Sequence, residues 1–134
     1  RLGDLICASA AGTDSAAIET LNDGLTLPSV ADWDMLYSAV NVANDAGISM
    51  AVGPVFTSDL FYGPDPELFS KLTRRGILGV EMEIAGLYSI SQAEGAQALA
   101  LVTVSDDIIR QEIMSSADRE STFGEMIQVA LGII

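Results

Sequence analysis

The sequence predicts an α/β fold, with a mixed and partly parallel central sheet flanked by helices, in a single domain of residues 1–134. Short apolar runs typical of strands alternate with segments whose apolar residues follow helical spacing. Gly or Pro stands at most of the boundaries between them. The most apolar run, Ala98–Val104, is expected to be a buried strand of the parallel part of the sheet, because apolar side chains occupy both of its faces.

The composition excludes several classes of partner. Six basic and 19 acidic residues give a net charge of -13, which argues against nucleic acid and against an anionic membrane surface. No apolar stretch is long enough to span a bilayer and no signal peptide is visible. Cys7 is the single cysteine and there is no histidine, so no intrachain disulfide can form and zinc is not expected. Composition alone leaves a metal site with oxygen ligands open, but no metal-ligating residues are predicted. A cytoplasmic location is the simplest expectation.

In the first part of the chain, Leu5–Ala8 is predicted to be a short strand. The polar segment Ala11–Ala31 is expected to be a long connection and a candidate functional loop. Apolar residues from Trp33 to Ala43 follow helical spacing, and Gly47 is well placed to end that helix. The chain begins at Arg1 rather than at a methionine and soon enters a strand, so we expect that a preceding segment is missing.

The middle of the chain predicts a strand and then a helix. Ile48–Phe56 is an extended run in which Gly53-Pro54 indicates a bend or an edge position. Asp65 is expected to cap a helix with Pro66 at its first position and Gly76 after its end.

The last part predicts two strands and two helices. Ile77–Val80 is a brief strand, followed by a helix that starts near Ile84 and that Gly95 closes. After the apolar strand described above, residues 105–116 are expected to be irregular, and a final helix carries Phe123 and the apolar residues that follow it.

Acidic clusters follow two of the predicted strands, at the edge where open α/β sheets bind ligands. One is Glu81-Met82-Glu83. If the strand continues this far, both glutamates share one face, where sugar hydroxyls would be suitable ligands for them. Alternatively, Glu83 begins or caps the next helix, whose dipole favours an acid.

The second cluster is Ser105-Asp106-Asp107. Asp106 is expected to be partly buried beside other carboxylates and therefore to carry a proton near neutral pH, as a general acid requires. Arg110 or Arg119 is expected to contact it and stabilise the ionised form that follows proton transfer. Alternatively, Asp106 only caps a turn, a role for which Asp107 is the better candidate. Upstream, Phe61-Tyr62 could stack on a base or could tie its loop to the core.

Three segments taken together resemble a known family: Ser58–Asp65, Gly76–Gly86 and Thr103–Asp106. They are similar to the bacterial hexameric-type purine nucleoside phosphorylases of the nucleoside phosphorylase superfamily, and the similarity extends over essentially the whole chain. The Glu-Met-Glu and Ser-Asp motifs are shared with related nucleosidases, whereas the Asp-Leu-Phe-Tyr segment narrows the match. The resemblance implies the carboxyl-terminal portion of a phosphorylase fold that lacks its amino-terminal strands.

The resemblance also implies phosphorolysis of purine ribo- and deoxyribonucleosides to a free base and a pentose 1-phosphate, as part of purine salvage, with inorganic phosphate as co-substrate and no cofactor. By position, Phe61-Tyr62 would line the nucleoside pocket and Val80 would pack against the base. Met82 and Glu83 would hold the ribose hydroxyls, with Glu81 close by.

For the acid, the resemblance implies that Asp106 protonates the purine at its imidazole-ring nitrogen, that Arg119 assists, and that Ser105 lies beside the base. Asp107 stands where the family more often has a histidine. The family's phosphate-binding residues, and a histidine from a neighbouring subunit of the hexamer, precede the part matched by this chain. We therefore expect no phosphate site here, a homo-oligomer, and little phosphorolysis by the isolated chain. The alternatives are a hydrolytic nucleosidase of the 5′-methylthioadenosine type and a catalytically incomplete nucleoside-binding fragment.

Overall fold

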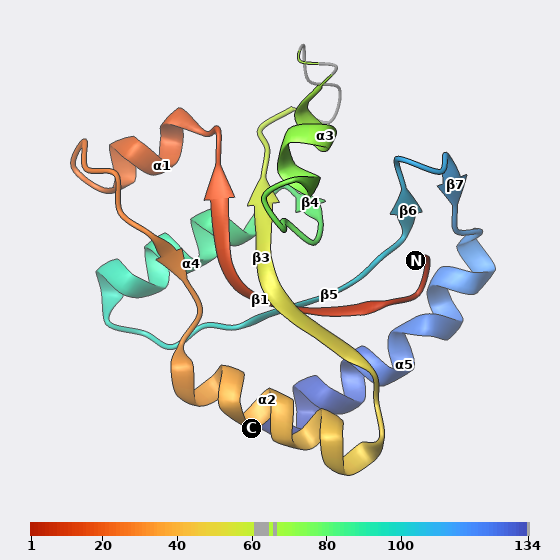
Figure 1. Cartoon of the computed structure of the whole chain (residues 1–134). Helices are drawn as coiled ribbons and strands as arrows, with labels where there is room; N and C mark the ends of the chain where they lie inside the picture. Colours follow the sequence, from red (N-terminus) through yellow and green to blue (C-terminus); the bar gives the residue numbers. More distant parts are fainter. Residues whose placement is uncertain (61–64, 66, 134) are drawn as a thin grey trace.

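The computed structural model of the chain describes residues 1–60, 65 and 67–133 (Figure 1). Within these residues the strands are β1 (Leu5–Thr13), β2 (Ser29–Val30), β3 (Met50–Thr57), β4 (Val80–Glu81), β5 (Ala100–Thr103), β6 (Asp106–Asp107) and β7 (Glu112–Ile113). The helices are α1 (Ala16–Leu21), α2 (Trp33–Ala46), α3 (Leu68–Thr73), α4 (Ile84–Glu94) and α5 (Ser116–Ile133). None of the described helices has the length and apolar character needed to cross a membrane.

The main sheet is mixed and partly parallel, as predicted. Its order is β2-β1-β3-β4, and β5 also pairs with β1. β3 runs parallel to β1 and β4 runs parallel to β3, whereas β2 and β5 are both antiparallel to β1. β1 therefore lies in the centre and holds the rest of the sheet together.

The prediction that Ala98–Val104 forms a buried strand of the parallel sheet is wrong. β5 pairs antiparallel to β1, with Leu5 opposite Thr103 and Ala8 opposite Ala100, and its residues are only half-buried. The run is apolar on both faces because Ala100 and Val102 pack against one core cluster and Leu101 against the other. Because both faces of β5 are covered, its residues are apolar on both sides. This burial does not determine whether β5 runs parallel or antiparallel to its neighbour.

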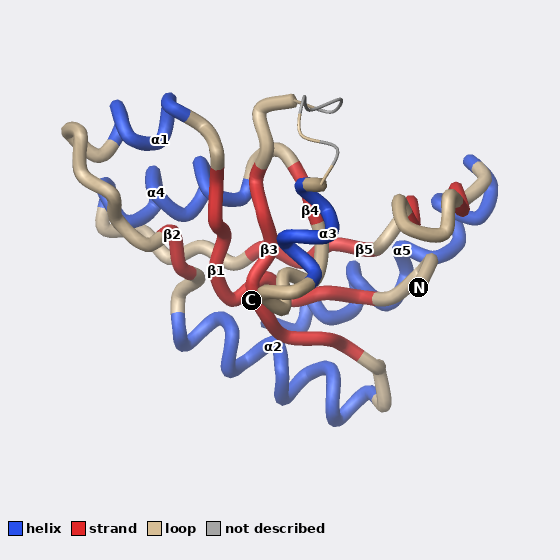
Figure 2. Tube along the Cα trace, turned by 45° about the horizontal axis from the view of Figure 1, so that its top comes forward, coloured by secondary structure: helices blue, strands red, loops and turns tan. Residues whose placement is uncertain are grey.

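β3 lies inside the sheet, so the edge position considered for Gly53-Pro54 is wrong. Ala8 pairs with Gly53 and Ala10 with Pro54, which leaves Ser9 as an extra residue in β1. This bulge lies opposite the one residue in β3 that has no N–H to donate. Both Figure 1 and Figure 2 show that β1 changes direction between its first and second halves.

Residues alternating along β1 fill two cores, one on each face of the sheet. On one face Ile6 and Ala8 pack with α4, whose Tyr88 is fully buried. On the other face Leu5 and Cys7 pack with α2 and α5. Burial raises the pKa of the Cys7 thiol to about 11 and that of Tyr88 to about 12.

The predicted ends of two helices are confirmed. α2 begins after Asp32, whose carboxylate accepts a hydrogen bond from the N–H of Met35 at 2.9 Å. It ends at Gly47, which has a φ of 67°, and α4 ends in the same way at Gly95, with a φ of 65°. The segment 11–31 is more ordered than predicted, because β1 continues to Thr13 and is followed by α1 and β2.

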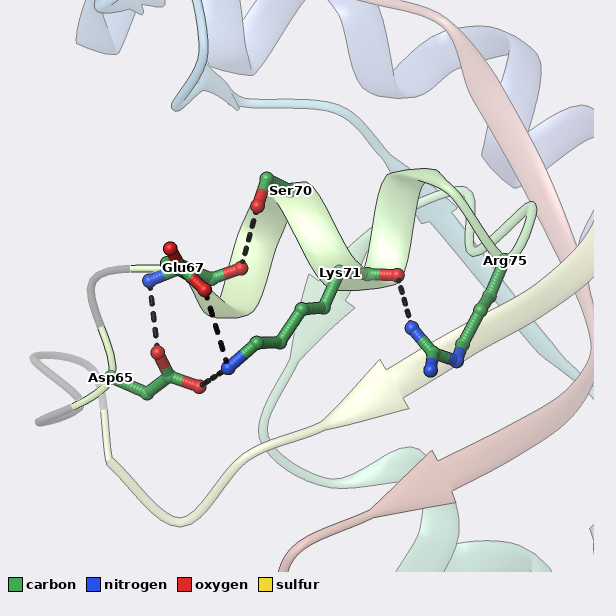
Figure 3. A network of polar contacts seen from close by, with 5 residues as sticks. All are labelled: Asp65, Glu67, Ser70, Lys71 and Arg75. Atoms are coloured by element: carbon green, nitrogen blue, oxygen red, sulfur yellow. Dashed lines mark hydrogen bonds and ion pairs between the residues drawn. The ribbon is translucent and has the colours of Figure 1, made fainter.

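The helix predicted from Asp65 begins later, at Leu68 (Figure 3). Asp65 still acts on its first turn, because its carboxylate accepts hydrogen bonds from the N–H of Glu67 at 2.9 Å and from Lys71 Nζ at 2.7 Å. These bonds, that from Lys71 first, lower the pKa of Asp65. Pro66 lies outside the described residues.

The stretch expected to be irregular, residues 105–116, instead contains an antiparallel hairpin. Asp106 pairs with Ile113 and Asp107 with Glu112. The final helix begins directly after it, at Ser116. Figure 1 shows the β6–β7 hairpin standing beside the start of α5, above the paired β1 and β5.

Candidate functional site

Glu81 lies at the carboxyl ends of the parallel strands β3 and β4, where Thr57 pairs with it. One oxygen of its carboxylate, Oε2, accepts hydrogen bonds from the N–H groups of Glu83 at 2.7 Å and Ile84 at 2.6 Å. The other oxygen accepts the hydroxyl hydrogen of Thr57. Glu81 therefore satisfies the free N–H groups at the start of α4, where the helix dipole also favours a negative charge.

β4 ends at Glu81, so Glu81 and Glu83 do not share one face of a strand. Glu83 precedes the first residue of α4, which agrees with the alternative that it begins the helix, but its own side chain makes no capping hydrogen bond. Glu83 and Met82 are exposed at the surface, and Val80 is half-buried. The capping carboxylate belongs to Glu81, two residues earlier than considered from sequence.

Asp106 follows β5 and contacts one of the two predicted arginines. Its Oδ1 lies 3.5 Å from Arg119 Nη2, and its Oδ2 accepts the hydroxyl hydrogen of Ser105 at 2.6 Å. Arg110 instead lies 3.7 Å from Asp107, whose carboxylate also accepts the N–H of Arg110 at 2.9 Å. The turn-capping role predicted for Asp107 is thus confirmed.

The expected burial of Asp106 among carboxylates is wrong. Its side chain is 38% exposed, and its described neighbours are a hydroxyl and a guanidinium. The hairpin that carries it lies beyond the end of the main sheet, which explains the exposure. Arg119 Nε is buried and, among the described residues, has no hydrogen-bond partner, so Asp106 leaves part of this guanidinium unsatisfied.

The two acidic clusters do not meet through the ends of parallel strands, as the sequence predicted. Glu81 is aligned through Thr57 with Thr13, the last residue of β1, whereas Thr103 is aligned with Leu5, the first. Within the described part of the chain, no hydrogen bond or ion pair joins Asp106 to Glu81 or Glu83. Because β1 bends, β4 and β6 nevertheless both lie above the β1–β5 pair in Figures 1 and 2.

Phe61 and Tyr62 lie outside the described residues. The segment that leads to them is tied to the end of β1 by Asp14, whose carboxylate accepts the hydroxyl of Ser58 at 3.2 Å and the N–H of Asp59 at 3.2 Å. The roles of Asp14 and Thr57 at this edge of the sheet were not predicted from the sequence. The sequence signal that could have indicated them is their position, because each is a polar residue at the end of an apolar strand.

Over residues 1–131 the chain matches the family model described as the Phosphorylase superfamily. The chain belongs to the phosphorylase superfamily. Its relatives include the protein named purine nucleoside phosphorylase DeoD-type 2 of Vibrio cholerae, 44% identical over 98% of this chain and 56% of that protein. The DeoD-type purine nucleoside phosphorylases of Yersinia enterocolitica and Psychromonas ingrahamii are 41% and 43% identical over 98% and 100% of this chain, and 54% and 57% of their own length.

Membership of this superfamily confirms the resemblance found in the sequence and agrees with the mixed α/β architecture. The chain spans a little over half the length of these relatives. The roles assigned to Phe61, Tyr62 and the other individual site residues stay predictions.

Proposed function

We propose that this chain forms the nucleoside-binding part of a purine nucleoside phosphorylase. The enzyme would cleave the N-glycosidic bond of purine ribo- and deoxyribonucleosides with phosphate, giving a free base and a pentose 1-phosphate. The relatives that match the chain carry this name. The observation that supports the chemistry best is the pair of Asp106 and Arg119, in which the proposed proton donor lies beside a cation that stabilises its ionised form.

In the proposed reaction, a phosphate oxygen bonds to the sugar carbon C1′ while the bond from C1′ to the purine breaks. The bonding electron pair moves to the purine, and Asp106 transfers its proton to the imidazole-ring nitrogen. Arg119 and the Ser105 hydroxyl then hold the resulting carboxylate, as they hold it in the structure. A bound purine would cover Asp106 and place its carboxyl group beside the imidazole-ring nitrogen that receives the proton.

Positive charge develops on the sugar as the glycosidic bond breaks. Glu83 is proposed to hold the ribose hydroxyls together with Met82, because the Glu83 carboxylate is exposed and uncommitted among the described residues, whereas that of Glu81 is already occupied. A carboxylate hydrogen-bonded to the sugar also stabilises the developing positive charge. Val80, Phe61 and Tyr62 are proposed to contact the base.

Inorganic phosphate is proposed as the co-substrate, with no cofactor and no metal ion. A phosphate dianion is bound by arginines, backbone N–H groups or helix starts. The chain has six basic residues, of which Arg110 and Lys71 already pair with carboxylates. The phosphate-binding groups are therefore proposed to come from outside this chain, in a cytoplasmic homo-oligomer that acts in purine salvage.

The test is hypoxanthine release from inosine, measured with and without phosphate, together with inosine binding by calorimetry. We expect the isolated chain to bind inosine and to show little phosphorolysis. Base release in phosphate-free buffer would instead indicate a hydrolytic nucleosidase. Robust phosphate-dependent turnover by the isolated chain would contradict the proposed division of the site, and failure to bind inosine would contradict the nucleoside site itself.

A further inference from the structure

The Thr57 side chain occupies an unusual position for the last residue of a strand. It is 3% exposed, although it carries a hydroxyl at the sheet edge where the site lies. This hydroxyl donates its hydrogen to Glu81 Oε1 and accepts the N–H of Ala85 at 2.9 Å. Both hydrogen-bonding functions of the hydroxyl are therefore used, one on β4 and one on α4.

The turn formed by residues 81–85, which joins β4 to α4, is held by two further sets of hydrogen bonds. The N–H of Ser58 donates to the carbonyl oxygen of Glu81 at 2.9 Å, which extends the pairing of β3 with β4 by one bond. On the α4 side, Glu81 Oε2 accepts the N–H groups of Glu83 and Ile84. The backbone from Glu81 to Ala85 is thus fixed at both ends by buried or partly buried polar groups.

Met82 and Glu83 are the residues that project from this fixed turn. Met82 is 44% exposed, and Glu83 is exposed as well. Neither side chain is held by a hydrogen bond or ion pair within the described chain, so the direction of each is set by the backbone that carries it. That backbone is in turn held by Thr57 through Glu81 and Ala85.

We propose that Thr57 is a positioning residue for sugar recognition. Its buried hydroxyl locks the Glu81 carboxylate onto the start of α4, and the locked turn presents Glu83 to the sugar hydroxyls of a nucleoside. This inference rests on the proposed function for the identity of the ligand. Its geometric part, the clamp of Thr57, Glu81 and Ala85, is a property of the chain itself.

The experiment compares Thr57→Val, which keeps the shape of the side chain and removes the hydroxyl, with Thr57→Ser, which keeps the hydroxyl. Ser89→Ala is the matched control, because Ser89 is also 3% exposed, lies on α4 and loses a buried hydroxyl contact, that with Ser29 at 2.9 Å. Calorimetry measures binding of inosine and of 2′,3′-dideoxyinosine, which lacks both ring hydroxyls of the sugar.

We expect Thr57→Val to weaken inosine binding by about tenfold, the effect of one lost hydrogen bond to a charged group, and to leave dideoxyinosine binding nearly unchanged. Thr57→Ser should restore the preference for inosine, and Ser89→Ala should keep it. If Thr57→Val kept the preference for inosine over dideoxyinosine, whether or not both bound more weakly, the positioning role would be overturned. If the unmodified chain binds no nucleoside, the proposed function fails and takes the sugar-recognition role with it.

Hydrogen exchange of the Ala85 and Ile84 amides tests the clamp without any ligand. These amides should exchange faster in Thr57→Val than in Thr57→Ser or Ser89→Ala, because the hydroxyl that accepts the Ala85 N–H is gone. Unchanged exchange in Thr57→Val would show that the hydroxyl does not hold the turn and would also overturn the proposal. If the unmodified chain binds inosine and Thr57→Val still prefers inosine over dideoxyinosine to the same degree, only the positioning role of Thr57 is rejected. The proposed function is then unaffected.

Discussion

The Tyr88 hydroxyl donates a hydrogen bond to the carbonyl oxygen of Ala8 at 2.5 Å. It also accepts the N–H of Ala100 at 3.0 Å, so a single fully buried side chain from α4 joins β1 to β5. The junction lies where β1 is about to bulge and change partner from β5 to β2. Tyr88 therefore connects β1 and β5 by side-chain hydrogen bonds at the place where the regular backbone pairing of β1 is interrupted.

Replacing Tyr88 by Phe should lower the free energy of unfolding by about 1–3 kcal/mol, because the buried Ala8 carbonyl and the partly buried Ala100 N–H lose this hydrogen-bond partner. Urea denaturation measures this change. Tyr37→Phe is the control, since Tyr37 is 58% exposed and should change stability by at most about 0.5 kcal/mol. Equal effects of the two substitutions would contradict the structural role of the Tyr88 hydroxyl.

Alkaline pH should destabilise the chain through two buried acids. The pKa of Cys7 is raised to about 11 and that of Tyr88 to about 12, so the folded state holds both protons more tightly than the unfolded state does. The associated stability is fully present below about pH 9 and is lost as pH rises toward 12, by about 1–3 kcal/mol for each group. Urea midpoints from pH 8 to 11 measure the loss. The urea midpoint of Tyr88→Phe should fall less than that of the unmodified chain as pH approaches 11. If both midpoints fell with the same dependence on pH, the contribution of Tyr88 would be contradicted.

The contact between α2 and α5 requires a glycine. A Cβ added at Gly132 would lie 2.6 Å from Val42 Cγ1, whereas one at Gly124, in the same helix, would meet none of the described atoms within 4 Å. Gly132→Ala should therefore destabilise the chain by about 1–3 kcal/mol. Gly124→Ala should be neutral or stabilising by up to about 1 kcal/mol, owing to helix propensity. Thermal unfolding distinguishes them, and combining Gly132→Ala with Val42→Ala should relieve part of the clash.

In an enzyme whose phosphate-binding groups are supplied from outside this chain, as proposed above, Asp106→Asn should lower phosphate-dependent release of hypoxanthine from inosine by about 100- to 10,000-fold, because the amide cannot deliver the proton. Arg119→Gln should also slow release, whereas Arg110→Gln should not, since Arg110 contacts Asp107 rather than Asp106. Initial rates at saturating phosphate measure these effects, and inosine affinity checks that the site is intact. If Arg110→Gln proved as damaging as Arg119→Gln, the assignment of the assisting cation would be wrong.

The elements that local patterns determine were predictable from sequence. α2 has clear apolar spacing, and both α2 and α4 end at glycines that adopt positive φ, which few other residues tolerate. The direction of β5 was not predictable, because strand pairing joins residues almost a hundred positions apart, such as Leu5 and Thr103. The two-residue strands β6 and β7 are too short to show any periodicity.

The candidate site divides in the same way. Contact between Asp106 and a following arginine was predictable because both lie within one local segment, and the structure selects Arg119. The engagement of Glu81 was not predictable, since its partner Thr57 is 24 positions earlier. Sequence spacing placed a helix start near Glu83, but only the fold shows which glutamate caps it.

The extra residue in β1 has a consequence for the length of that segment. Ile6 and Ala8 face the same core as Ala11, so the inward-facing positions switch from even to odd numbers across Ser9. Removing the extra residue would restore simple alternation and leave Ala11 on the same face, whereas adding a further residue would turn every later side chain of the strand over, including the approach to Asp14. Selection on this segment should therefore tolerate a single-codon deletion at Ser9 better than a single-codon insertion.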